Sequence, residues 1–249
     1  MPNGPHLEDV IRALLESEGD LPQVVVTNLG QSGEYIRRLL DSGRYEKQIA
    51  NIPGLDYVLI RYGLNDIFRR EGFSENFPKD YQELISRLRA DHPNATIVLM
   101  TVIPQGDENG VIPINELIKE IAQKEDLRLL DIYRRYVAEL RRNPNMLSYR
   151  RLPLAHIPEN KRIFVKPFVV AGNPDMVEVL DNRLDAHFAH LPSWFSDRHP
   201  NLAGYHVIAD ETALYLAPLL RARAAASTQP LPRTVRRGST ESTEESIRP

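Results

Sequence analysis

The chain has 249 residues, a formal net charge of −3 and no cysteine. The absence of cysteine excludes a disulfide framework, a cysteine-ligated zinc site, an iron–sulfur cluster and a thiol nucleophile. No apolar run reaches the roughly 18 residues of a membrane span, and the near-balanced charge shows no nucleic-acid footprint. We therefore expect neither a transmembrane segment nor a nucleic-acid partner.

Hydrophobic periodicity predicts alternating helices and strands through the first 142 residues. Apolar side chains recur at helical spacing over residues 6–18, which gives a first amphipathic helix. Short apolar runs predict strands at 24–26, 57–62, 96–103 and 127–132, separated by helices at 33–40, 78–90 and 111–124 and followed by a helix that ends near 142. This alternation is typical of a mostly parallel sheet covered by helices on both faces.

The rest of the chain is less regular. Proline, asparagine and histidine are scattered through 143–195, which we interpret as an insert beside the site. Within it, residues 162–170 resemble a strand or hairpin arm, and Pro167 favours a sheet edge. A last helix is predicted over 203–223, and the polar composition from Ala224 onward predicts a disordered tail over 224–249. We thus expect one domain over 1–223.

The first candidate motif runs from Asn28 to Gly33, directly after a predicted strand and before a helix. Glycines at such a turn let a ligand approach the backbone, and the N–H groups of the helix start attract an anion or a developing oxyanion. A tight turn with glycine at positive φ explains the same residues without any ligand.

The second motif is Gly63-Leu64-Asn65-Asp66, which follows the predicted strand at 57–62. Ligands of open α/β sheets bind at the carboxyl ends of strands. Asn65 has an amide that could donate to an oxyanion, and Asp66 could cap a helix or hold the loop. Both residues are also common in ordinary turns and caps.

The third motif places Asp197, His199 and Asn201 just before the last helix. An aspartate beside a histidine can fix the imidazole tautomer and stabilise the imidazolium, as in catalytic triads. Asn201 suits the N-cap of the following helix. A surface histidine next to an acid is the alternative.

Taken in this order, the three motifs resemble those of the SGNH/GDSL hydrolase superfamily, over about residues 7–220. The resemblance implies a flavodoxin-like three-layer α/β/α fold and a serine esterase reaction without a cofactor or metal. It also implies that the Gly33 backbone N–H and the Asn65 side-chain amide form an oxyanion hole. His199 would then be the general base and Asp197 its orienting acid.

The family's nucleophile is the serine of a strand followed by Gly-Asp-Ser, and this tripeptide does not occur in the sequence. We expect that block to lie upstream, so that the chain begins a few residues beyond the serine. The absent strand would be the central one of a 2-1-3-4-5 sheet. The strands at 24–26 and 57–62 would then either pair with each other or leave the chain poorly folded.

Without that serine we expect the chain as given to be inactive, because the covalent step has no nucleophile. Ser32 and Ser196 are the serines nearest to the motifs, and both are better interpreted as loop hydroxyls. The last motif also departs from the family's Asp-x-x-His spacing, since one residue separates Asp197 from His199. Asp181 and Asp185 are therefore alternative orienting acids.

Three histidines near the last motif, His187, His190 and His206, are expected at the surface or behind the site. A metal site built from His187, His190 and Asp197 lacks a preorganising motif and is disfavoured.

The function implied by the resemblance is hydrolysis of an ester. The expected substrates are small-molecule or glycan esters, such as O-acetyl groups on carbohydrates, or lipid acyl esters including lysophospholipids. Trp194 and Phe195 are candidate pocket walls, and aromatic rings suit either a sugar or an acyl chain.

Two other functions compete with the esterase. A non-catalytic relative would bind a glycan or a protein partner. A flavodoxin-like nucleotide binder lacks the expected phosphate loop. The N-terminal residues do not form a signal peptide, so we expect a cytoplasmic protein as given, or a secreted one if the true start lies upstream. The sequence does not indicate an oligomeric state.

Overall fold

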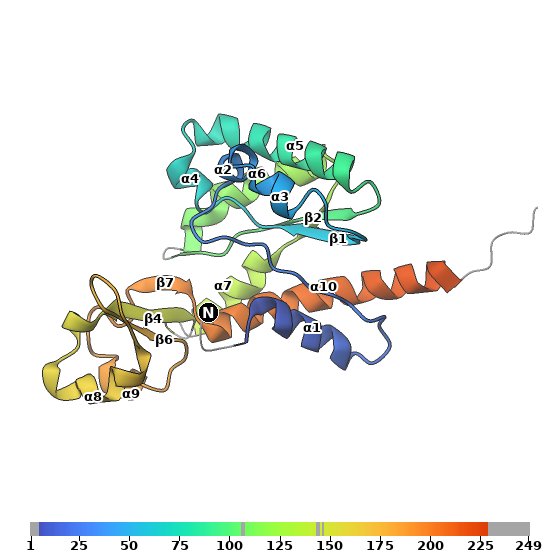
Figure 1. The fold of residues 1–249 in the computed structure, drawn as a ribbon. Helices are drawn as coiled ribbons and strands as arrows, with labels where there is room; N and C mark the ends of the chain where they lie inside the picture. The colour runs from blue at the N-terminus through green and yellow to red at the C-terminus, as the bar shows by residue number, and fades with distance from the viewer. Residues whose placement is uncertain (1–4, 106–107, 143–144, 146, 229–249) are drawn as a thin grey trace, which may run out of the picture.

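Three parallel strands form the central sheet of the protein, seen in a computed structural model that describes residues 5–105, 108–142, 145 and 147–228 (Figure 1). Their order is β1 (Tyr57–Ile60), β2 (Thr96–Met100) and β3 (Arg128–Leu130). Tyr57 lies opposite Thr96, and Val98 lies opposite Arg128. The predicted α/β fold class with a parallel sheet is thus confirmed.

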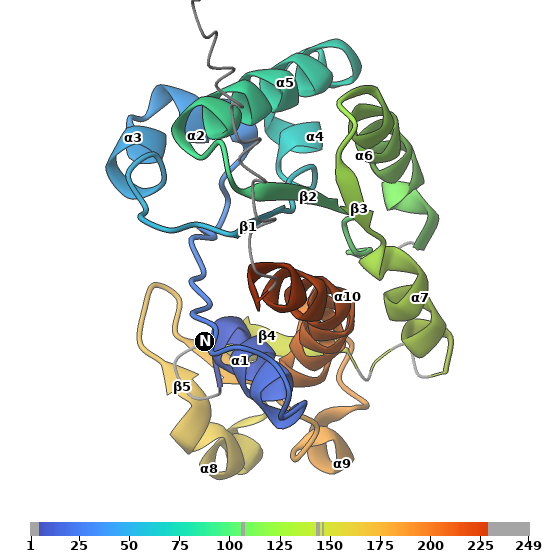
Figure 2. The same cartoon turned by 90° about the vertical axis from the view of Figure 1, so that its right-hand side faces the viewer.

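Helices cover both faces of this sheet (Figure 2). One layer contains α2 (Ile36–Asp41), α3 (Arg44–Gln48), α4 (Asp66–Arg69), α5 (Phe73–Asp91) and α6 (Ile112–Lys124). The opposite layer contains α1 (Leu7–Ser17), α7 (Ile132–Arg142) and α10 (Leu202–Thr228). Each of these helices except the short α3 and α4 lies at or close to a helix predicted from periodicity.

The middle strand shows why the apolar run at 96–103 has no polar alternation. Ile97 and Leu99 are buried in the core under α5 and α6, whereas Val98 and Met100 are buried in the core against α7 and α10. Successive strand residues point to opposite faces, and both faces of a covered parallel sheet are apolar.

The predicted strand at 24–26 is not formed, and this prediction was wrong. The segment is extended but belongs to no strand of the sheet, and Val25 is 90% exposed. Val24 and Val26 pack on the cluster between α1 and α10 that also contacts Tyr57. Figure 2 shows the segment between α1 and α2 passing from one helical layer to the other beside β1.

The two strands expected to close the gap therefore do not pair with each other. Within the described part of the chain, β1 has a partner on one side only. An apolar triplet becomes a buried strand only where a neighbour supplies backbone hydrogen bonds, and no described strand does so here.

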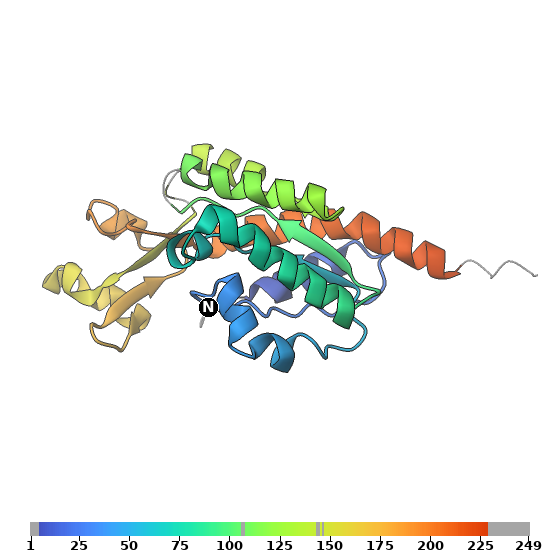
Figure 3. The same cartoon turned by 90° about the horizontal axis from the view of Figure 1, so that it is seen from above.

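Residues 148–200 form a second, antiparallel sheet with its own core. Its order is β5 (Val169–Val170), β6 (Met176–Val179), β4 (Ser148–Pro153) and β7 (Asp197–Pro200). Leu152, Val177, Phe188 and Trp194 are buried together there. Figure 3 shows this sheet, in yellow and light orange, at one end of the molecule, away from the C-terminal end of α10.

The prediction of a strand or hairpin arm over 162–170 holds only for its last two residues, which form an edge strand. The segment begins with α8 (Arg162–Val165) and a 3-10 turn at Lys166–Phe168, and only Val169–Val170 pairs in the sheet. Pro167 lies inside the 3-10 turn, where its fixed φ is compatible with the backbone.

The C-terminal boundary also differs from the prediction. Helix α10 continues to Thr228, so residues 224–228 are helical rather than part of a disordered tail. The rest of the predicted tail, 229–249, lies outside the described residues.

Candidate active site

The third motif lies at the junction of β7 and α10. The Asn201 side chain accepts a hydrogen bond from the Gly204 backbone N–H at 3.0 Å, so Asn201 caps the helix as expected. The Asn201 backbone N–H donates to the Leu147 carbonyl at 2.9 Å, which ties the junction to the start of β4. A Cβ on Gly204 would lie 2.7 Å from the Tyr136 hydroxyl, so glycine allows α10 to approach α7.

Asp197 and His199 form a hydrogen-bonded pair on this strand. The His199 backbone N–H and the ring Nδ1 both lie within 2.8 Å of Asp197 Oδ1, the ring contact being 2.7 Å. The spacing of two suits a strand, because residues i and i+2 point to the same side. The Asp-x-His departure from the family's spacing is therefore accommodated by extended backbone.

A third side chain completes this group. The Nε of Arg151, on β4, donates to Asp197 Oδ2 at 2.7 Å. Burial by itself would raise the pKa of Asp197, but the hydrogen bonds from His199 and the charge of Arg151 hold that pKa below its ordinary value. Asp197 is accordingly a carboxylate at neutral pH. Its side chain is 11% exposed, whereas that of His199 is 55% exposed.

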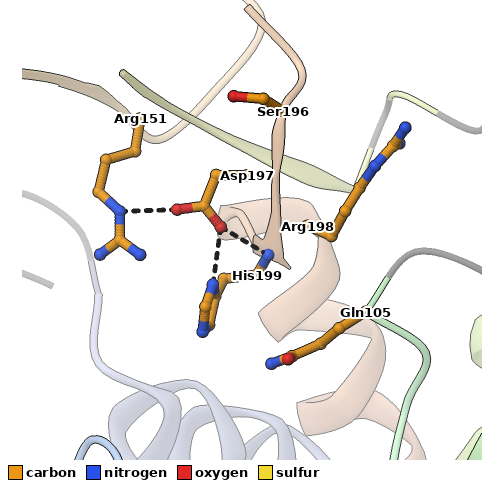
Figure 4. A pocket seen from close by; sticks show the side chains of 6 residues that line it. All are labelled: Gln105, Arg151, Ser196, Asp197, Arg198 and His199. Carbon is orange, nitrogen blue, oxygen red and sulfur yellow. Dashed lines mark hydrogen bonds and ion pairs between the residues drawn. The ribbon is translucent and has the colours of Figure 1, made fainter. Parts of the chain in front are cut away.

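The pair lines a shallow cavity of about 440 Å³ that is wide open to solvent (Figure 4). Its walls are formed by Gln105, Arg151, Ser196, Asp197, Arg198 and His199. Gln105 follows the carboxyl end of β2, and its side chain points toward the His199 ring. Arg198 points away from His199, to the other side of β7.

Sequence reasoning missed Gln105 and Arg151. The position of Gln105 after a predicted parallel strand is a signal that could have identified it. Arg151 has no comparable signal, because the pairing of β4 with β7 joins segments 46 residues apart in a stretch without clear periodicity.

The first two motifs meet each other in a separate hydrogen-bonded cluster. The Asn65 side-chain amide donates to the Glu34 carbonyl at 3.0 Å. The Asp66 carboxylate accepts from the backbone N–H groups of Ile36 and Gly63, each at 2.9 Å. Asp66 thus holds the two loops together, as expected for one of its roles.

Gly33 and Asn65 do not line the cavity that contains His199. Gly33 has φ +71°, in the left-handed region where glycine is favoured. The Asn65 amide is committed to a backbone carbonyl in this structure. Their assignment to an oxyanion hole stays a prediction, and so do the roles of Asp197 and His199.

The alternative acids have partners of their own. Asp185 accepts hydrogen bonds from Arg150 at 2.6 Å and from the Trp194 indole at 2.7 Å. Asp181 is paired with Arg183. Of the three aspartates considered, the structure therefore brings only Asp197 to His199.

The prediction that Trp194 walls the pocket was wrong, because this side chain has no exposed surface and belongs to the core of the second sheet. Phe195 is partly buried against the same core, 5.2 Å below the Arg150 guanidinium, and does not line the cavity. The hydrogen bond from its indole to Asp185, the partner of the buried Arg150, helps to hold the Trp194 ring inside.

The serines near the site do not contact the base. Ser196 donates its hydroxyl to the Ser193 carbonyl at 2.8 Å. Among the described residues, no serine hydroxyl is hydrogen-bonded to His199. In the described part of the chain, no three or more His, Asp or Glu side chains are grouped so that they could hold a metal ion.

Comparison with known proteins gives a family match and a fold match. The sequence model of the GDSL-like lipase/acylhydrolase family matches residues 3–156, more than half of the chain. No curated protein matches the sequence. None of the helices that the structure describes is both long enough and apolar enough to span a bilayer.

Two solved structures have a similar fold. A carbohydrate esterase family 3 protein from Talaromyces cellulolyticus is 15% identical, with a TM-score of 0.54 over 88% of this chain and 92% of that one. The acetyl xylan esterase AlAXEase is 20% identical, with a TM-score of 0.53 over 84% of this chain and 90% of that one.

Proposed function

The chain belongs to the GDSL-like lipase/acylhydrolase family, and from that premise we propose that His199 and Asp197 are the base and the orienting acid of its ester-hydrolysing site. The observation that carries the proposal is the 2.7 Å contact between His199 Nδ1 and Asp197 Oδ1 at the wall of a cavity. A carboxylate on Nδ1 fixes the tautomer and leaves Nε2 to accept a proton.

The reaction class is the hydrolysis of an ester through an acyl-enzyme. His199 would take the proton of an attacking hydroxyl and return it to the leaving alcohol. Asp197 would stabilise the imidazolium without being protonated, which its lowered pKa supports. Asn65 and Gly33 would supply the oxyanion hole after a rearrangement that frees the Asn65 amide from the Glu34 carbonyl.

The printed sequence lacks Gly-Asp-Ser, and no described serine is bonded to His199. We therefore infer that these 249 residues by themselves do not form the acyl-enzyme, since a base without a nucleophile cannot start the covalent step.

The substrate that the cavity suits best is a short acyl ester of a polar alcohol, such as an acetylated carbohydrate. All six residues that line the cavity are polar or charged. Polar surface makes up the larger part of its wall, which suits a polar substrate better than a long acyl chain. The two similar structures are named for a carbohydrate esterase and an acetyl xylan esterase, which supports the same class.

The test is hydrolysis of p-nitrophenyl acetate by the chain alone and by the chain extended with an apolar strand and Gly-Asp-Ser ahead of Pro2. We expect hydrolysis only from the extended chain, with its loss on His199→Ala and a large reduction on Asp197→Asn. A matched extension ending in Gly-Asp-Ala controls for folding effects. An extended chain that folds but does not hydrolyse the ester would overturn the proposal.

A non-catalytic module is the second candidate, and it is favoured because no serine in the described part of the chain contacts His199. The same experiment separates the two functions. A module that only binds would keep its fold without the extension and would gain no esterase activity from it.

A further inference from the structure

Arg151 joins the Asp197–His199 pair to the wall of the cavity. Its Nε donates to Asp197, and its guanidinium lies 5.2 Å from the ring centre of Tyr149. Tyr149 is itself fixed by a 2.7 Å hydrogen bond from its hydroxyl to Glu178. The side chain of Arg151 is therefore held in place on two sides although it is 36% exposed.

The two terminal nitrogens of Arg151 have no acceptor among the described residues. Figure 4 shows the guanidinium on the same side of the Asp197 carboxylate as the His199 ring. These N–H groups thus face the part of the cavity next to the base. A guanidinium offers parallel donors that match the oxygens of a carboxylate or phosphate.

The charge of the cavity wall favours an anion. Arg151 and Arg198 are among the residues that line it, and Asp197 is the single carboxylate among them. Asp197 already accepts hydrogen bonds from His199 and from Arg151. The side-chain amide of Gln105 adds a neutral donor to the wall. The lining residues therefore carry more positive than negative charge, although Asp197 compensates part of the charge of Arg151.

We propose that this cavity binds an anionic group of the ester substrate, a carboxylate or a phosphate, through the terminal N–H groups of Arg151. The anion would anchor the substrate so that its ester carbonyl lies next to His199. This inference rests on the proposed ester hydrolysis and names the substrate class of the same site. Because Arg151 is already fixed by Asp197 and Tyr149, little side-chain freedom is lost on binding.

Arg198 provides a matched control. It lines the same cavity and carries the same charge, but it points to the other side of β7 and makes no bond to Asp197. If the general field attracted the anion, removal of either arginine would weaken binding equally. If Arg151 binds the anion directly, only its removal matters strongly.

The test measures binding of two probes, inorganic phosphate and succinate, by calorimetry and by NMR shifts of the His199 ring. It uses the full 249-residue protein and the variants Arg151→Met, Arg151→Lys and Arg198→Met. We expect millimolar binding to the unmodified protein with shifts at His199. Arg151→Met should weaken binding about 10- to 100-fold, the loss typical of charge-assisted hydrogen bonds, and Arg198→Met less than about threefold.

Arg151→Lys keeps the positive charge but loses the paired, parallel N–H donors of the guanidinium. We therefore expect an affinity between those of the unmodified protein and Arg151→Met. Preference for phosphate would assign a phosphorylated substrate, and preference for succinate a carboxylated one. Binding of neither probe, equal losses in the two methionine variants, or binding without shifts at His199 would overturn the inference. These readouts do not need turnover, so failure of the extended chain to hydrolyse esters is a separate result that bears on the proposed function.

Discussion

Gly63 is the position where a single added methyl group should disturb the candidate site most clearly. It opens the second motif, has φ +135° and lies in the interior. A Cβ there would lie 2.4 Å from Ile114 Cγ2, with Phe77 and Val102 atoms at 3.5 and 3.6 Å. The Gly63 backbone N–H also donates to Asp66, so a shift of this residue moves the loop that carries Asn65.

The expected cost of Gly63→Ala has two parts. Forcing a non-glycine residue into a positive-φ conformation costs about 1–3 kcal/mol. Inserting a methyl group into packed side chains costs about 1–3 kcal/mol more. We expect the free energy of unfolding to fall by roughly 4 kcal/mol, a large share of the ~5–15 kcal/mol typical of a domain.

Gly43→Ala is the matched control. Gly43 has φ +69° but nothing within 4 Å of the added Cβ, so only the conformational cost of about 1–2 kcal/mol applies. Urea unfolding followed by far-ultraviolet circular dichroism measures both variants. Combining Gly63→Ala with Ile114→Ala should recover about 1–3 kcal/mol relative to additivity, because the clashing methyl is gone. Equal losses in the two glycine variants, or full additivity in the double variant, would refute the packing argument.

Three further predictions concern buried charge. Burial raises the pKa of Asp66 to about 6 despite its backbone donors, so the folded carboxyl keeps a proton that the unfolded one loses near pH 4. The free energy of unfolding should fall by up to about 3 kcal/mol from pH 4 to 6, and Asp66→Asn should abolish that slope in urea titrations. Arg61 has a buried Nη1 without a described partner. Arg61→Met should therefore raise the free energy of unfolding by about 1–3 kcal/mol, seen as a higher urea midpoint. An unchanged midpoint would contradict this. Arg150→Met should lower the free energy of unfolding by about 2–3 kcal/mol, because it leaves the Asp185 carboxylate without its guanidinium partner. The loss is smaller than for a fully buried pair, since Asp185 is partly exposed. The fluorescence of Trp194, the single tryptophan, should then shift to the red.

The sheet and its helices could be predicted because local pattern and tertiary environment agree there. Residues 97–100 are apolar on both strand faces, and both faces are covered. The triplet Val24–Val26 has the same local pattern but a different environment. Its pairing depends on a neighbouring strand, which three valines cannot encode, and the structure leaves Val25 exposed.

The candidate site could be predicted where its residues are close in sequence. Asp197 and His199 lie on one strand, so their contact follows from the two-residue repeat. Arg151 and Gln105 reach the same cavity from β4 and from the loop after β2. The contact of Arg151 depends on the order of strands in the second sheet, and that of Gln105 on how the first sheet lies against the second. Sequence periodicity specifies neither.

The strand that carries the base follows directly on residues 143–195, the segment predicted to be an insert. β7 pairs with β4, and its last residues lead directly into α10 of the main layer. The second sheet therefore does more than border the cavity, because it fixes the backbone of Asp197 and His199 and supplies Arg151. Deleting residues 148–180 would remove β4 and the Arg151 contact together, and β7 would lose its described ladder. The aspartate and histidine would then have the right spacing but no strand to hold them on one side, which is why this stretch has to be treated as part of the site.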